Sequence, residues 1–181
     1  RAVFGSKLGW ERASYFLPEG ERLAAPTLDT PAWLPWVLEE QRACREDAVV
    51  FDQTSFSKFA LKGRDALAVL QRLCANEIDV PPGRMVYTAM LNARGGFESD
   101  LTVLRVAERE FLILTGSAQA TRDFSRIERM IAPEEHAALV DVSGAYSVIS
   151  VMGPKAQALL ESLSPDAFGK DALPFSRFAT V

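Results

Sequence analysis

Two segments of the chain share one order of positions, an extended apolar run followed by a glycine and a helical pattern. In the first, residues 58–62 form the run and Gly63 follows. In the second, residues 148–152 are followed by Gly153 and by Pro154, which suits the first position of a helix. Counted from each glycine, alanine at +3 and leucine at +7 and +10 coincide. We therefore predict an internal duplication, with copies about ninety residues apart and one residue inserted in the second strand.

Between these segments, short apolar runs are separated by turn residues. Residues 85–91 and 97–106 are rich in β-branched and aromatic residues and flank the turn sequence 92–96, and a third run covers 111–114. Three such runs joined by short turns are typical of an antiparallel meander. Because strands, hairpins and helices alternate, we predict an α+β fold with antiparallel sheets and packed helices, built as two related halves.

Two further helices are predicted from the spacing of apolar residues. Residues 34–49 place Trp36 and Cys44 loosely on one stripe among charged residues. Residues 118–130 carry an apolar stripe as well, and Ser117 before them is a residue type that commonly caps a helix. Residues 4–36 show neither pattern for more than a few positions, although they contain three Trp, two Phe and four Pro. We expect this segment to be an irregular aromatic arm that buries its rings against other parts of the protein or a neighbour.

Composition and charge exclude several classes of function. The 181 residues are 48% hydrophobic and 24% charged with a net charge of -4, which is typical of soluble globular proteins and argues against a nucleic-acid-binding surface. No apolar run approaches the roughly 18 residues of a membrane span. His136 is the single histidine, which excludes any metal site with two histidine ligands. Cys44 and Cys74 form no disulfide pattern, so we expect a reducing compartment. Of such compartments, we expect the bacterial cytoplasm rather than the mitochondrial matrix.

One acidic residue lies in the middle of a predicted strand. Alternation places Glu98, Asp100 and Thr102 on one face, although aspartate is uncommon in strands. A solvent-facing side of a half-exposed sheet is one explanation. The same face, however, continues through the apolar residues Leu104 and Val106. A carboxylate on an apolar face is partly desolvated, which favours its protonated form unless a donor pairs with it, and such a group can handle protons.

The register of the hairpin decides whether Asp100 has a partner. If the loop has four residues, 92–95, the residue numbers of directly opposite positions add up to 187. Tyr87 then lies directly opposite Asp100 on the same face. A five-residue loop shifts the register and sends Tyr87 to the opposite face. Alternatively, Tyr87 is an ordinary cross-strand aromatic residue.

Several of these stretches together resemble the tetrahydrofolate-binding aminomethyltransferase family, which includes the glycine-cleavage T protein. The resemblance covers essentially the whole chain, and the run from Tyr87 through Gly95-Gly96 to Asp100 is its most specific part. The opening Gly9-Trp10-Glu11-Arg12 is similar to the segment that links the flavin and folate domains of dimethylglycine and sarcosine dehydrogenases. The matching residues lie in stretches 50–59, 63–66, 76, 83–88, 91–103 and 153–154.

The resemblance implies roles for six residues. Asp100 matches the acidic residue that binds a folate nitrogen and assists proton transfer. Tyr87 matches a residue that lines the pterin pocket. Wall positions are implied for Phe56, Thr102 and Leu104, and a polar contact for Thr115, where the T protein often has asparagine. No metal is implied.

The resemblance also implies an organisation and an activity. Residues 1–46 would be a linker arm and helix following an absent flavin domain, and residues 47–181 a folate-binding domain truncated at its C-terminal side. The parent would be an FAD-dependent dehydrogenase of dimethylglycine or sarcosine type that passes a one-carbon unit to tetrahydrofolate. Its partners would be the folate and the flavin domain of the same chain, without nucleic acid or membrane. Because further ligands would follow Val181, we expect the fragment alone to be inactive.

Two alternative functions stay open. A stand-alone aminomethyltransferase like the T protein is possible, although the segment around Trp10 argues against it. A non-catalytic regulatory or scaffold module on the same fold is the other, although Asp100 and Tyr87 favour retained folate chemistry.

Overall fold

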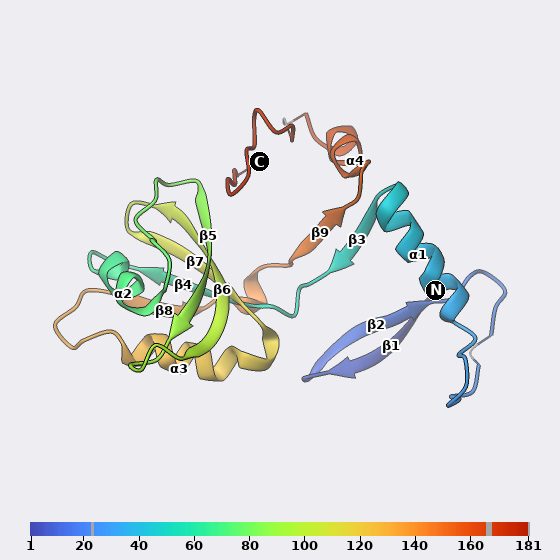
Figure 1. The fold of residues 1–181 in the computed structure, drawn as a ribbon, viewed down its shortest axis with the longest axis horizontal. Helices are drawn as coiled ribbons and strands as arrows, with labels where there is room; N and C mark the ends of the chain where they lie inside the picture. Colours follow the sequence, from blue (N-terminus) through green and yellow to red (C-terminus); the bar gives the residue numbers. More distant parts are fainter. Residues whose placement is uncertain (23, 166–167, 181) are drawn as a thin grey trace. The chain divides into compact units, whose positions relative to one another are not determined.

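The computed structural model describes nearly the whole chain, namely residues 1–22, 24–165 and 168–180. The chain divides into two compact units, Arg1–Asp52 with Ile149–Pro165 and Gln53–Val148 with Asp166–Val181 (Figure 1). The functional boundary placed between residues 46 and 47 stays a prediction. Within the described residues, no helix combines the length and the apolar character that crossing a membrane requires.

The larger unit contains a five-stranded antiparallel sheet in the order β5-β6-β7-β4-β8 (Figure 1). The predicted meander is confirmed, because β5, β6 and β7 are neighbours in the sheet as well as in the chain. The strands are β4 (Ser57–Lys62), β5 (Arg84–Leu91), β6 (Phe97–Ala107), β7 (Glu110–Thr115) and β8 (Ala138–Asp141).

One face of this sheet packs against two helices to form the core. Helix α2 (Ala66–Leu73) buries the residues whose spacing predicted it, and α3 (Ala120–Arg129) buries Ile127. The ring of Phe59 meets that of Phe124 edge-on, with centroids 5.3 Å apart. Alternate strand positions supply further core side chains, among them Phe59, Leu61, Met90, Leu101, Val103, Phe111 and Ile113. The period-two pattern therefore leaves the opposite face of the sheet outside the core.

The start of α3 differs from the prediction. Ser117 does not cap the helix but opens a short 3₁₀ turn, η1 (Ser117–Gln119), and the helix begins at Ala120. The Ser117 hydroxyl donates instead to the carbonyl oxygen of Ser55, on the segment that leads into β4. The hydroxyl thus donates to a distant carbonyl, whereas as a cap its oxygen would accept a hydrogen bond from a backbone N–H of the first helical turn.

The smaller unit begins with a hairpin where we expected an irregular arm. Strand β1 (Ala2–Lys7) pairs with β2 (Trp10–Phe16) through a two-residue turn, with φ of 54° at Leu8 and 82° at Gly9. Two positive φ values are the geometry that lets a two-residue turn follow the strand twist. The prediction failed because neither strand alternates cleanly between apolar and polar residues.

Helix α1 (Leu34–Glu46) confirms the predicted helix but ends earlier than residue 49. The chain turns at Asp47 and enters β3 (Val49–Asp52), which pairs with β9 (Ile149–Met152). Helix α4 (Ala156–Leu163) follows β9, as the duplicated pattern predicts.

The two copies of the duplicated segment exchange their leading strands. Strand β3 precedes β4 in the first copy, and β8 precedes β9 in the second. In the structure β3 pairs with β9, whereas β8 pairs with β4. Each leading strand is therefore hydrogen-bonded to the second strand of the other copy.

Equivalent hydrogen bonds occur at equivalent positions of both copies. The N–H of Lys58 donates to the Ser143 hydroxyl at 2.9 Å, and that of Val148 donates to the Thr54 hydroxyl at 3.2 Å. The offset between matched residues is 89 before the second strand (54 to 143) and 90 within it (58 to 148), as a single inserted residue requires. The duplication is thus visible in the backbone as well as in the sequence.

Both glycines of the duplication sit in left-handed backbone against a carbonyl group. Gly63 has φ of 138°, and a Cβ there would lie 2.1 Å from the carbonyl oxygen of His136. Gly153 has φ of 111°, and its Cβ would lie 2.3 Å from the carbonyl oxygen of Asp47. Only glycine permits this approach, which lets the first turn of each helix bond to the segment before a leading strand.

Candidate functional site

The face of the five-stranded sheet opposite the core carries half-exposed apolar residues on β5, β6 and β7, whereas its β4 residues are buried. We call it the open face. One cross-strand row runs Tyr87, Thr102, Leu114 and Lys58, according to the pairing of β5, β6, β7 and β4. The next row is Met85, Leu104, Leu112, Ala60 and Val140. The pairing of the sheet thus brings residues from five strands to one face.

A tyrosine and a carboxylate are joined on the open face. The phenol of Tyr87 donates a hydrogen bond to Oδ2 of Asp100 over 2.7 Å, and 66% of the Tyr87 side chain is exposed. This hydrogen bond, together with the charge of the carboxylate, raises the pKa of Tyr87 above its ordinary value of 10.0. The pair therefore holds a fixed acceptor that a ligand can reach from solvent.

The register that creates this pair differs from both alternatives that the sequence left open. The loop has five residues, 92–96, and Tyr87 lies opposite Thr102 rather than opposite Asp100. A bulge between Met90 and Leu91 takes up one extra residue of β6, because Leu91 pairs with Phe97 and Met90 with Ser99. Beyond the bulge, the residue numbers of directly paired positions add up to 189. Because 189 is odd, like the 187 of a four-residue loop, the same residues face the same side of the sheet in both registers. Tyr87 and Asp100 therefore share a face but are not directly opposite each other, and the bulge explains why the five-residue loop does not send Tyr87 to the opposite face.

The titration of Tyr87 gives a first test of this geometry. We expect its phenol to ionise above 10.0 in the native protein and to return toward that value in Asp100→Asn, because the amide carries no charge. Tyrosinate absorbance, taken as the difference from Tyr87→Phe, measures it. The pair should stabilise the native state at neutral pH, with this contribution disappearing as pH rises through the raised pKa. An unchanged titration in Asp100→Asn would contradict the assigned hydrogen bond.

The predicted wall residues lie on β6 and just before β4. Thr102 and Leu104 are half-buried on the open face, in the two rows described. Phe56 is 38% exposed and lies just before β4, on the alternation that continues to Lys58. Within the described residues, no hydrogen bond joins these three to Asp100, and their contact with a ligand stays a prediction.

Thr115 faces away from the other candidates. It pairs with Leu101, a core residue, and is 1% exposed. Its hydroxyl donates to Oδ2 of the buried Asp123 at 2.5 Å. The structure therefore does not bring Thr115 to the open face, and we leave it out of the candidate site. The apolar run 111–114 carries no period-two signal, so the sequence did not show which face Thr115 joins.

Several residues of the open face were not singled out by the sequence. Among them, Leu112 and Leu114 lie between the pair and β4 and provide half-buried apolar surface. Residues of β7 are apolar on both faces, so the sequence pattern did not show which of them the open face includes.

Asn76 supports the backbone of β5. Its side-chain amide donates to the carbonyl oxygen of Tyr87 at 2.7 Å, and its N–H donates to the Thr88 hydroxyl at 3.0 Å.

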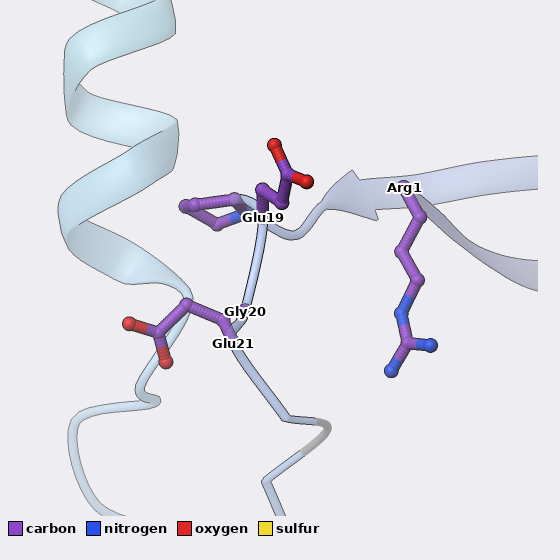
Figure 2. A pocket seen from close by; sticks show the side chains of 5 residues that line it. Arg1, Glu19, Gly20 and Glu21 are labelled. Atoms are coloured by element: carbon purple, nitrogen blue, oxygen red, sulfur yellow. The ribbon is translucent and has the colours of Figure 1, made fainter.

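A pocket in the smaller unit offers a weaker alternative. It has a volume of about 510 Å³ and is lined by Arg1, Pro18, Glu19, Gly20 and Glu21. Figure 2 shows the side chains of Arg1, Glu19 and Glu21 pointing in different directions. Ligand sites usually gather a few polar groups that converge on one point. The open face, where Tyr87 and Asp100 do converge, is therefore the better candidate.

Comparison with known proteins gives matches over the whole chain. A family model described as the GCVT N-terminal domain matches residues 1–181. In solved structures, glycine cleavage system aminomethyltransferase T from Bartonella henselae matches with a TM-score of 0.76 and 24% identity, covering 97% of this chain and 43% of that one. That likeness confirms the mixed fold of helices and antiparallel sheets.

Three curated relatives are similar in sequence. The 4-methylaminobutanoate oxidase (formaldehyde-forming) of Paenarthrobacter nicotinovorans is 38% identical, and the match covers 94% of this chain and 21% of the relative. The mitochondrial pyruvate dehydrogenase phosphatase regulatory subunit of Mus musculus is 33% identical, covering 93% of this chain and 20% of the relative. Mitochondrial sarcosine dehydrogenase of Homo sapiens is 32% identical, covering 96% of this chain and 23% of the relative. The chain thus spans about a fifth of the length of these relatives.

Proposed function

Because this chain belongs to the GCVT N-terminal domain family, we propose that it is the tetrahydrofolate-binding part of an FAD-dependent N-methyl amine dehydrogenase of dimethylglycine or sarcosine type. In this proposal it transfers a one-carbon unit to tetrahydrofolate. The observation that carries the proposal is the hydrogen-bonded pair of Tyr87 and Asp100 on the open face. FAD and the amine would be bound by the flavin domain of the same parent chain.

The open face fits a reduced folate in its chemistry. A pterin ring is flat, with apolar faces and with N–H groups along its edge. Asp100 offers a carboxylate whose Oδ2 accepts from Tyr87, while a carboxylate has about four acceptor sites in all. Thr102 and Leu104 supply polar and apolar contacts next to it. We infer that these residues hold the ring edge at the carboxylate and its faces on the apolar rows.

The proposed chemistry needs little more than positioning and a proton acceptor. Tetrahydrofolate would supply the amine nitrogen that takes up the one-carbon unit. Asp100 would orient the ring through charge-assisted hydrogen bonds and accept a proton as that nitrogen reacts. Tyr87 would keep the carboxylate in one orientation through its 2.7 Å hydrogen bond. The folate ring, once bound over the carboxylate, would take up the one-carbon intermediate before water hydrolyses it to formaldehyde.

The test uses the full-length protein supplied with an N-methyl amine such as sarcosine. With tetrahydrofolate present, the wild type should release less free formaldehyde and form the one-carbon folate instead. We expect Asp100→Asn to lower this trapped fraction at least about tenfold, because the amide cannot accept the proton. Glu108→Gln, which removes a carboxylate from the turn after β6, is the matched control and should trap like the wild type.

Each outcome of this experiment separates the candidate functions. Unchanged trapping in Asp100→Asn would remove the role given to that carboxylate. Absence of trapping in the wild type would contradict the folate function and favour a regulatory or scaffold module, which the likeness to the phosphatase regulatory subunit makes a specific alternative. Trapping from an added aminomethyl donor, without amine oxidation, would favour a stand-alone aminomethyltransferase.

A further inference from the structure

The side chain of Asn92 organises the loop between β5 and β6. Its Oδ1 accepts the N–H groups of Arg94 and Gly96, each at 3.0 Å. Its Nδ2 donates to Oε1 of Glu98 at 2.9 Å. The backbone of Asn92 adds two bonds, donating to the Gly96 carbonyl and accepting from the Gly95 N–H, both at 2.9 Å. One residue thus bonds to both the loop and the bulge.

Glycine at position 96 is required by this arrangement. A Cβ on Gly96 would lie 2.8 Å from Nδ2 of Asn92. Gly95 has φ of 74°, a conformation that side chains rarely adopt. The two glycines therefore make room for the asparagine side chain and for the turn that it closes.

Helix α3 holds the two ends of the bulge. The guanidinium of Arg126 donates to the carbonyl oxygen of Leu91, at the last paired position of β5. The guanidinium of Arg122, one helical turn earlier, donates to the carbonyl oxygen of Glu98 at 2.6 Å. Both carbonyls belong to the irregular part of the hairpin, so the helix fixes the backbone that Asn92 shapes.

The core allows two registers of this hairpin, and they place Asp100 differently. Leu101 and Val103 of β6 must face the core together with Met90 of β5. The residue numbers of two directly paired positions must therefore add up to an odd number. A four-residue loop without a bulge gives 187, and the five-residue loop with its bulge gives 189. Changing from one to the other slides Asp100 by two residues along β5, which is about 7 Å.

Only the observed register suits the length of a tyrosine side chain. Directly opposite Cβ atoms lie about 5 Å apart, which is less than the reach of a phenol, whereas diagonal neighbours lie about 7–8 Å apart. In the observed register Asp100 pairs with Ala89 and is diagonal to Tyr87, and the phenol reaches it at 2.7 Å. The other register would place the carboxylate beside the base of the ring.

We propose that Asn92 is a positioning residue that selects the bulged register and thereby places Asp100 within reach of the Tyr87 phenol. It acts through the loop and does not itself touch the phenol or the carboxylate. The inference deepens the proposed function, because it says what orients the acceptor, but its test needs no folate.

The test is the titration of Tyr87 in the full-length protein, taken as the difference between each variant and the same variant carrying Tyr87→Phe. In Asn92→Ala the elevation of the Tyr87 pKa should be lost, as it should be in Asp100→Asn. The double variant Asn92→Asp with Glu98→Gln exchanges donor and acceptor but retains all three side-chain bonds, so it should recover the elevation. Asn92→Asp alone places two carboxylates together and should recover less.

The outcomes distinguish positioning from general stability. Thermal unfolding of each variant identifies those that are folded. An elevated Tyr87 pKa in folded Asn92→Ala would overturn the proposal. If Asn92→Ala fails to fold, the double variant decides, and a folded double variant with an ordinary Tyr87 pKa would overturn it too. Absence of one-carbon trapping in the wild type would contradict the proposed function while leaving this inference intact.

Discussion

Replacing Gly63 with alanine should lower the free energy of unfolding by more than about 3 kcal/mol. The added Cβ would lie 2.1 Å from the carbonyl oxygen of His136 and 2.9 Å from Cα of Ala137. Both are backbone atoms leading into β8, so relief requires β8 to move away from β4. The same backbone accepts the N–H of Asp65 at 3.2 Å, and this bond would be lost. Urea denaturation followed by circular dichroism measures the change.

Gly95→Ala is the matched control for Gly63→Ala. Gly95 also has a positive φ, 74°, but a Cβ there meets nothing within 4 Å. Its substitution should therefore cost only the strain of left-handed backbone, about 1–2 kcal/mol. Equal losses at the two positions would show that the close approach to His136 contributes nothing.

Replacing Phe59 with alanine should cost about 3–5 kcal/mol of stability. Phe59 is fully buried in the middle of β4, and its ring meets Phe124 of α3 edge-on. The substitution leaves a cavity between sheet and helix and also removes an aromatic pair. We expect α3 to loosen, and with it the arginine bonds to the hairpin, so the Tyr87 titration should broaden as well.

Phe56→Ala is the control, three residues earlier in the same segment. Phe56 is 38% exposed, so its truncation should cost less than about 1.5 kcal/mol. Denaturant unfolding of both variants compares a buried ring with an exposed one of the same chemistry. Comparable losses would show that the core is not where the contacts place it.

The fold was predictable wherever the spacing of apolar residues matched a single type of element with one buried face. Strand β4 and helix α2 combine a short apolar run, a glycine and helical spacing, so their existence and order followed from the sequence. The hairpin of β1 and β2 did not, because its turn is Leu8-Gly9 and its strands lack alternation.

The candidate site was predictable in its residues but not in its geometry. Asp100 was identifiable because a carboxylate interrupts an apolar strand face. Its relation to Tyr87 depended on a bulge at Glu98, and a single extra residue cannot be located from alternation alone. The orientation of Thr115 depended on β7, where both faces are apolar. Local pattern thus specifies which residues carry chemistry, whereas long-range register specifies how they meet.

The exchange of leading strands has a consequence for synthesis on the ribosome. Strand β3 bonds to β9 and β8 bonds to β4, so both partnerships span the whole meander between them. A nascent chain that has reached the end of α2 has made β3 and β4 but neither of their exchanged partners. Closing such long loops is slow because chain entropy is lost before the stabilising contacts form, and folding rates fall as strand pairings become less local. The first copy therefore cannot complete its strand pairing, and the edges of β3 and β4 that face their exchanged partners stay unpaired, until the second copy has been translated.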